Sequence, residues 1–201
     1  MTQTAAGDAA AEGVSVSCPA PILPFLNDAD CAVGGGGRMR FHLIDRIDRW
    51  EPGKSLTAAK YLALGEEYLA DHFPQFPIMP GVLMLQACVE AASWLWRVST
   101  DHRHPVIVLR ELKSVKYGTF MLPGRRMDVT AELTKADAPG DTATFKAKGA
   151  NDAGEQTVNA IFTLHGYSLA ARGPAGAAAD ARLVEHWKAR WALLTGELLQ
   201  K

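Results

Sequence analysis

Residues 72–98 restrict the possible folds of this chain more than any other stretch. They begin with a loop, residues 72–81, in which every third residue from Pro74 to Pro80 is proline. Proline has a fixed φ and no amide donor, so it excludes a regular helix or a central strand there. Pro80 suits the first position of a helix, and the residues after it, 82–98, are apolar on nearly every side. A helix that is apolar all round is buried, so we expect other elements to surround it.

Strand-like segments follow this helix. After residue 105, runs rich in β-branched and apolar residues are separated by clusters of Gly, Pro, Asn and Asp. Several consecutive strands after one buried helix predict an antiparallel sheet wrapped around that helix, which is an α+β fold. The predicted strands are 106–112, 114–120, 126–134, 142–150 and 156–165, and an earlier one is 55–64.

Composition divides the chain into four parts. Residues 1–37 are rich in Ala and Gly and end in four glycines, which predicts a flexible N-terminal extension. The compact domain is expected over 38–169, and the Ala- and Gly-rich segment 170–180 predicts a linker. Residues 181–201 predict an amphipathic C-terminal helix, which we expect to dock on the protein's own domain rather than on a foreign partner. Its apolar face consists of Leu183, Trp187, Trp191, Leu194 and Leu198.

Composition also excludes several classes of protein. The chain of 201 residues has a net charge of −1, whereas nucleic-acid-binding domains usually carry a strong basic excess. Its cysteines, Cys18, Cys31 and Cys88, lack the paired spacing of a disulfide framework or a zinc site. No apolar run is long enough to span a bilayer, and the N-terminus does not resemble a signal peptide. We therefore expect a cytoplasmic protein in a reducing compartment, without a metal.

Two residues of the proline loop are candidates for chemistry. His72 has a pKa range suited to proton transfer near neutral pH, and the stiff loop can hold it in place. A histidine in a loop is also commonly structural. Gly81 opens the buried helix, where free amides and the positive end of the helix dipole can stabilise a carbonyl oxygen that gains negative charge. Alternatively, the glycine serves only close packing.

A polar stripe runs along the otherwise apolar helix. Gln86, Glu90, Ser93 and Arg97 follow one another at spacings of four, three and four residues, so they share one face. Gln86, near the buried end of the helix, favours a role in a site. Ser93 and Arg97 are equally consistent with a face that points to solvent.

The loop carries a resemblance to a known family. His-Phe-Pro-x-x-Pro-Ile-Met-Pro-Gly-Val-Leu, residues 72–83, followed by a helix of small residues, resembles the 3-hydroxyacyl-acyl-carrier-protein dehydratases of bacterial fatty-acid synthesis, the FabZ/FabA type. Residues 40–47 are similar to the opening segment of that family, and residues 115–124 resemble a later strand with its Pro-Gly turn. The resemblance covers roughly residues 38–166.

The resemblance implies a hotdog fold that works as a dimer or as a trimer of dimers. Each dimer has two sites at its interface, fed by a narrow acyl tunnel, and the substrate arrives on the phosphopantetheine arm of acyl carrier protein. No metal or redox cofactor is implied. His72 matches the histidine that takes the proton alpha to the thioester, and Gly81 matches the glycine whose amide polarises the carbonyl. The residues expected to contact substrate are Phe73, Pro74, Phe76, Ile78, Met79, Pro80 and Val82.

The chain departs from the family at the catalytic acid. The family places a carboxylic acid where this chain has Gln86, and usually a glutamine where this chain has Glu90. An amide forms hydrogen bonds but is not an acid, and a carboxylate one turn away is displaced by about 5 Å. Asp71 also replaces the usual glycine before the histidine, and it either orients His72 or only stiffens the loop.

Three hypotheses follow. The first is an active dehydratase in which Glu90 supplies the proton, directly or through a water held by Gln86. The second is a weakened hotdog subunit that binds acyl thioesters and accompanies an active paralogue. The third is a hotdog thioesterase in which Gln86 positions a water. The first is favoured because the loop and Gly81 are intact.

Basic residues gather on the strand-rich half and predict a surface for the acidic carrier protein. The alternative is an ordinary solvated face of the sheet. Arg125 and Arg126 are the preferred docking pair, with Lys113 and Lys116 beside them. The full set is Arg110, Lys113, Lys116, Arg125, Arg126, Lys146 and Lys148.

Overall fold

The structure is a computed structural model that describes residues 42–137 and 140–197. The chain divides into two compact units, residues 1–37 and residues 38–201, and only the second contains described residues. The N-terminal extension expected over 1–37 therefore lies outside the described residues, as do Cys18 and Cys31.

Within the described residues, six strands form one antiparallel sheet in the order β1–β2–β4–β5–β6–β3. Buried and exposed residues alternate along the middle of β5, so one face of the sheet forms the core. Strands β1 and β3 are the two edges. The strands are β1 (Arg46–Glu51), β2 (Ser55–Tyr61), β3 (Val106–Tyr117), β4 (Arg126–Asp137), β5 (Thr142–Asn151) and β6 (Gln156–Tyr167).

Strand β3 corrects the predicted pair of strands 106–112 and 114–120. It is continuous, and its register against β6 shifts once between Leu109 and Glu111 and again between Leu112 and Ser114. Each shift inserts a residue and interrupts the alternation of the side chains. The interrupted pattern, read from the sequence alone, resembles a break between two strands.

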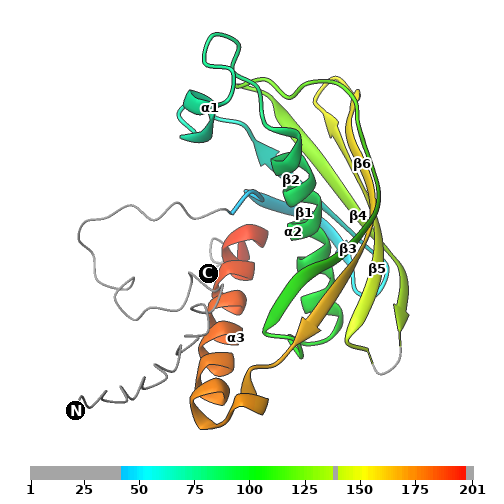
Figure 1. Cartoon of the computed structure of the whole chain (residues 1–201), viewed down its shortest axis with the longest axis vertical. Helices are drawn as coiled ribbons and strands as arrows, with labels where there is room; N and C mark the ends of the chain where they lie inside the picture. Colours follow the sequence, from blue (N-terminus) through cyan, green and yellow to red (C-terminus); the bar gives the residue numbers. More distant parts are fainter. Residues whose placement is uncertain (1–41, 138–139, 198–201) are drawn as a thin grey trace, which may run out of the picture. The chain divides into compact units, whose positions relative to one another are not determined.

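Helix α2 (Gly81–Ser99) lies against the inner face of the sheet, between the sheet and the C-terminal helix (Figure 1). Its buried residues, Trp94 and Leu95 among them, belong to the same core as Phe145 and Phe162 of the sheet. A sheet wrapped around one long helix is the hotdog arrangement, and the predicted α+β fold is confirmed. In the part of the chain that the structure describes, no helix combines the length and the apolar character needed to span a membrane.

The C-terminal helix, α3 (Pro174–Thr195), begins within the predicted linker, so the linker over 170–180 is wrong. A short 3-10 helix, η2 (Ala170–Arg172), precedes it. The buried carboxylate of Asp180 accepts hydrogen bonds from the Ser168 hydroxyl at 2.6 Å and from the Leu169 amide at 3.0 Å, which ties the first turns of α3 to the chain before them. Alanine-rich sequence also has the highest helix propensity.

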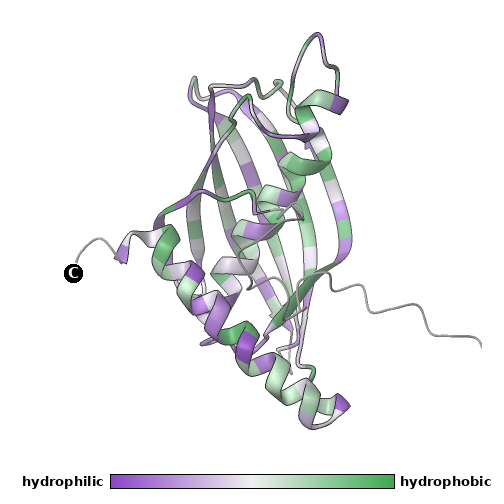
Figure 2. Cartoon of the chain, turned by 90° about the vertical axis from the view of Figure 1, so that its left-hand side faces the viewer, coloured by the Kyte–Doolittle hydropathy of each residue, from purple (hydrophilic) through white to green (hydrophobic). Residues whose placement is uncertain are grey.

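Two tryptophans dock α3 on the domain, as predicted. The Trp187 indole donates to the Pro105 carbonyl at 3.0 Å, and its ring packs edge-on against Trp94 at 5.5 Å. Trp191 packs edge-on against Trp50 of β1 at 5.1 Å. Both apolar and polar residues occur along the whole of α3 (Figure 2), and the apolar residues Leu183 and Leu194 are buried. Leu198, the last residue of the predicted apolar face, lies outside the described residues.

Candidate active site

His72 lies at the end of α1 (Tyr68–Asp71), a single helical turn, and its amide donates to the Tyr68 carbonyl at 3.1 Å. The ring nitrogen Nδ1 is 3.0 Å from the carbonyl oxygen of Ile78. Because a carbonyl oxygen only accepts, Nδ1 carries the proton in this contact, and Nε2 is left as the lone-pair acceptor that a general base needs. Asp71 is exposed, and among the described residues it forms no hydrogen bond with His72.

The loop after His72 is anchored at its second half. The Met79 amide donates to the Met121 carbonyl at 2.9 Å, and Ile78 and Met79 are buried in the core of the single chain. Phe73 packs edge-on against His72 at 4.7 Å and has a φ of +51°, a left-handed conformation that costs roughly 1–3 kcal/mol for such a side chain. The loop therefore holds His72 in one defined orientation.

The predicted substrate-contacting residues separate into two groups. Ile78 and Met79 belong to the core, whereas Phe73, Phe76 and Val82 are more than half exposed, at 61%, 56% and 68%. Residues 73–76 line a shallow apolar recess of about 370 Å³. In the single chain, an acyl group can therefore reach the rim of the loop but not its buried half.

Gly81 is the first residue of α2, so its amide has no acceptor within the helix. The first hydrogen bonds of the helix are those in which the Pro80 carbonyl accepts from the amides of Leu83, at 2.9 Å, and Met84, at 3.1 Å. A Cβ at Gly81 would lie 3.2 Å from the ring of Tyr117, at the end of β3. The structure thus shows the packing reason for this glycine, and the same geometry leaves its amide free to meet a carbonyl oxygen.

Gln86 and Glu90 have different surroundings, although they share a helix face. Gln86 is exposed. Glu90 lies roughly 6 Å further along the helix axis, and its Oε2 accepts from the amides of Leu43 at 2.7 Å and Ile44 at 3.2 Å. Its Oε1 is 3.6 Å from His42 Nδ1. Glu90 therefore anchors the segment that leads into β1, and its role as a proton donor stays a prediction.

The rest of the polar stripe is covered, which corrects the solvent-facing interpretation of Ser93 and Arg97. The Ser93 hydroxyl donates to the Val89 carbonyl at 2.8 Å within the helix. The Arg97 guanidinium lies 4.2 Å from the ring centre of Trp187 on α3. Burial lowers the pKa of Arg97 to about 10, and the Glu90 carboxylate acts in the opposite direction. The only sequence signal for this cover was the pair of tryptophans on the C-terminal helix.

The predicted docking cations do not form one patch. Arg125 donates to Asp152 at 2.9 Å, and Arg126 donates to Asp128 at 2.7 Å and to Asp48 at 3.1 Å. Both arginines are therefore engaged within the chain. Lys113 and Lys116 lie on the edge strand β3. Strands β5 and β6 lie between β3 and β4, the strand that begins with Arg126.

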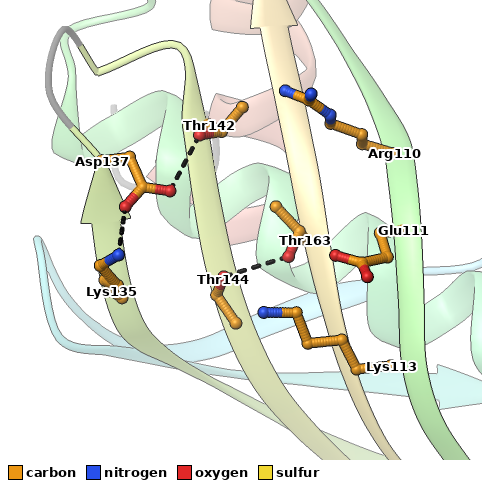
Figure 3. A pocket seen from close by; sticks show the side chains of 8 residues that line it. All are labelled: Arg110, Glu111, Lys113, Lys135, Asp137, Thr142, Thr144 and Thr163. Atoms are coloured by element: carbon orange, nitrogen blue, oxygen red, sulfur yellow. Dashed lines mark hydrogen bonds and ion pairs between the residues drawn. The ribbon is translucent and has the colours of Figure 1, made fainter.

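Strand register places basic residues on the face of the sheet that points away from α2. Lys116 lies opposite Asn159 and Asn159 opposite Lys148, so the two lysines share one line across β3, β6 and β5. Further along β3, a groove of about 280 Å³ crosses four strands (Figure 3). It is lined by Arg110, Glu111, Lys113, Lys135, Asp137, Thr142, Thr144 and Thr163. Within residues 42–137 and 140–197, no three His, Cys, Asp or Glu side chains converge in a way that could hold a metal.

Comparisons with known proteins agree with this architecture. Residues 36–161, more than half of the chain, match the family model of the FabA-like domain. The 3-hydroxyacyl-[acyl-carrier-protein] dehydratase FabZ of Ruminiclostridium cellulolyticum is 33% identical over 110 residues, which are 55% of this chain and 78% of that protein. The FabZ of Levilactobacillus brevis is 34% identical over 92 residues, which are 46% of this chain and 62%, under two thirds, of that protein.

Among solved structures, the dehydratase heterocomplex ApeI:P of Xenorhabdus doucetiae contains a chain of the same fold. Its TM-score is 0.53 at 13% identity, over 63% of this chain and 84% of that chain. At this level of identity the likeness concerns the fold alone.

Proposed function

We propose that this chain, which belongs to the FabA-like domain family, is a 3-hydroxyacyl-acyl-carrier-protein dehydratase that removes water to give a trans-2-enoyl thioester. One observation carries the proposal: a single loop presents an oriented histidine at one end and a free helix-start amide at the other. The loop holds His72 with its Nδ1 against Ile78, and Gly81 begins α2.

His72 and Gly81 perform the first half of the reaction. Nε2 of His72 takes the proton alpha to the thioester, and the Ile78 carbonyl holds the ring and stabilises the imidazolium that forms. The Gly81 amide donates to the thioester oxygen as that oxygen gains charge. A general base contributes about 10²–10⁴-fold, and one such donor contributes about 10²–10³-fold. The elimination is redox-neutral, so the proposal needs no cofactor beyond the phosphopantetheine arm of the substrate.

The proton for the departing hydroxyl needs a second route. The Glu90 carboxylate is already hydrogen-bonded to two backbone amides. We therefore propose that a water held by Gln86 carries the proton to the departing hydroxyl. The proton comes from the imidazolium of His72, and the hydroxyl leaves from C3 as water. No net proton is then consumed, and His72 returns to its neutral form.

The active unit in this proposal is a homodimer in which the two β3 strands pair. β3 is an edge strand, and its apolar residues Val108, Leu109 and Leu112 are 40%, 41% and 40% exposed in the single chain. An open apolar edge is a template for pairing with another strand. Pairing brings two helices α2 to one interface, where His72 of one subunit meets Gln86 of the other.

Acyl carrier protein is the proposed partner. Lys116 and Lys148 support a docking surface on the outer face of the sheet, since they are two strands, or about 10 Å, apart on one line. Lys116 precedes Tyr117, whose ring lies against Gly81 on the other face of the sheet, so this surface and the candidate site share the same end of β3. We prefer it to Arg125 and Arg126, which are paired with aspartates.

A second candidate function is an acyl-thioester-binding subunit with weak activity that accompanies an active paralogue. The observation that favours it is the amide of Gln86, which stands exposed where the resemblance places an acid.

One assay tests both candidates. Purified protein is incubated with 3-hydroxyacyl carrier protein, and enoyl product and free thiol are measured for the wild type and for Gln86→Glu. The dehydratase proposal expects enoyl product from the wild type, and about 10-fold or more from the variant, because a carboxylic acid restores general acid catalysis. Product from the variant alone supports the second candidate. Free thiol without enoyl product indicates a thioesterase, and no product from either protein contradicts the proposal.

A further inference from the structure

A lysine is buried on the core side of β2. Leu56, Ala58 and Lys60 alternate along that strand on the face that packs against the core, and Lys60 is only 4% exposed. Its Nζ is 2.7 Å from Glu66 Oε1 and 3.6 Å from Asp45 Oδ2. Removing an ammonium group from water costs several kcal/mol unless partners compensate for it. The two carboxylates therefore compensate for the burial of Lys60, and this costly arrangement suggests a role for the lysine beyond packing.

The two carboxylates connect Lys60 to the elements before and after β2. Asp45 precedes β1, and its Oδ2 also accepts from the Tyr61 amide at 2.7 Å. Glu66 precedes α1, and its carbonyl accepts from Leu69 at 3.0 Å as α1 begins. Burial, then Glu66 and Asp45, raise the pKa of the Tyr68 hydroxyl on α1, as expected for a hydroxyl that is close to the two carboxylates. One cation thus joins the start of β1, the end of β2 and α1.

Helix α1 ends at the proposed base. It has only four residues, Tyr68–Asp71, which is too short to be stable without tertiary contacts. Its last turn holds the His72 amide on the Tyr68 carbonyl, and the ring then reaches Ile78. The position of the imidazole therefore depends on where α1 sits, and Glu66 fixes α1 to Lys60. Displacement of a reacting group by about 1 Å can reduce a rate about 100-fold.

We propose that Lys60 is a positioning residue for the dehydration: through Glu66 and Asp45 it fixes α1 on the sheet and so orients His72 toward the substrate. The inference rests on the proposed function, in which His72 is the base. Without the ammonium group, the two carboxylates repel each other beside the partly buried Tyr68, and α1 loses its anchor. Lys60 itself touches neither substrate nor His72 in this scheme.

The test compares Lys60→Met, which keeps an apolar stem, with Lys54→Met. Lys54 forms an exposed ion pair with Glu51 at 3.0 Å in the hairpin between β1 and β2, with 71% and 59% of the two side chains exposed, so it controls for loss of charge nearby. Well below the unfolding midpoint, kcat of Lys60→Met falls about 10- to 100-fold while KM changes less than about 3-fold. Lys54→Met keeps the wild-type kcat. Lys60→Arg, which retains the charge, recovers part of the lost rate.

A second readout does not need activity. The NMR resonance of the His72 ring, assigned by its loss in His72→Asn, is recorded in the wild type and both Met variants. Lys60→Met shifts or broadens this resonance, whereas Lys54→Met matches the wild type. A purely structural role would lower the unfolding midpoint and leave both kcat and the resonance unchanged, which would overturn the proposal.

The remaining outcomes are also decisive. If Lys60→Met does not fold, Glu66→Ala replaces it in both measurements, since it removes the acceptor that ties α1 to Lys60 and leaves Asp45 beside the ammonium group. A folded Glu66→Ala protein with an unchanged kcat and an unchanged His72 resonance contradicts the inference. If the wild type forms no enoyl product, the proposed function fails, and the His72 resonance alone then decides whether Lys60 positions the ring.

Discussion

A single carboxylate, that of Glu90, connects three parts of the chain. Its Oε2 accepts from the Leu43 and Ile44 amides, and its charge partly offsets the burial of Arg97 under Trp187. A charged acceptor on two amides is a strong interaction, and hydrogen bonds to charged groups contribute about 1.5–3 kcal/mol each. Such a group is difficult to use as an acid that reaches the substrate, because the two amides hold its carboxylate in place.

We therefore predict that Glu90→Gln reduces stability rather than chemistry. The free energy of unfolding falls by about 2–3 kcal/mol, since a neutral amide replaces the charged acceptor and the buried Arg97 loses a compensating negative charge. Well below the unfolding midpoint, kcat stays within about 3-fold of the wild type, because general acid help worth 10²–10⁴-fold does not come from this residue. Urea unfolding and steady-state kinetics measure the two quantities.

Glu185→Gln, on the exposed side of α3, is the matched control and changes neither quantity. The opposite pattern, a fall of 100-fold or more in kcat with unchanged stability, would establish Glu90 as the proton donor.

Gly81 offers a way to separate packing from catalysis. A Cβ at this position lies 3.2 Å from the Tyr117 ring, so Gly81→Ala moves that ring or the start of α2. We predict that Gly81→Ala lowers both stability and kcat, and that adding Tyr117→Leu restores the unfolding midpoint but not kcat, because the methyl group still crowds the thioester oxygen. Thermal unfolding and kinetics on the three variants distinguish the cases. Full recovery of kcat in the double variant would mean that the glycine serves packing alone.

Whole elements were predictable where local signals are strong. The proline loop and the start of α2 agree with the structure, because Pro80 and the continuous apolar run are local features. The start of α3 was missed because its anchor, Asp180, acts through contacts with residues 168–170 that no periodicity reveals. The partners of Glu90 were missed for the same reason: the Leu43 amide is 47 residues away in the chain.

Docking of α3 has a measurable energetic consequence. Trp187 packs against Trp94, donates to Pro105 and covers Arg97. We predict that Trp187→Ala lowers the free energy of unfolding by about 2–3 kcal/mol, which is below the roughly 3–5 kcal/mol of a fully buried tryptophan because Trp187 is partly exposed. Leu193→Ala, at a position that is 59% exposed on the same helix, changes it by less than about 0.5 kcal/mol. Equal effects of the two substitutions in chemical denaturation would show that α3 is not docked through its tryptophan face.

At the scale of the whole molecule, the single chain holds only part of the proposed site. His72 and Gly81 share one loop, whereas Gln86 is exposed on α2 and faces away from the core. Neither the pattern of residues nor the single chain reveals what lies opposite Gln86. The open edge of β3, with its apolar residues exposed, is the feature that a second copy would cover.

Mixed dimers test whether two subunits share one site. His72→Ala and Gln86→Ala each inactivate both sites of a homodimer if each site combines His72 of one subunit with Gln86 of the other. When the two inactive variants are unfolded together and refolded, half of the dimers are mixed, and one site in each mixed dimer has both wild-type residues. We predict recovery of about one quarter of the wild-type activity, measured as enoyl product per chain. If both residues act within one subunit, each mixed dimer contains two defective sites and no activity returns, whatever the extent of exchange.

Leu112→Lys, which places a charge on the exposed edge of β3, should abolish the recovery and halve the mass measured by light scattering.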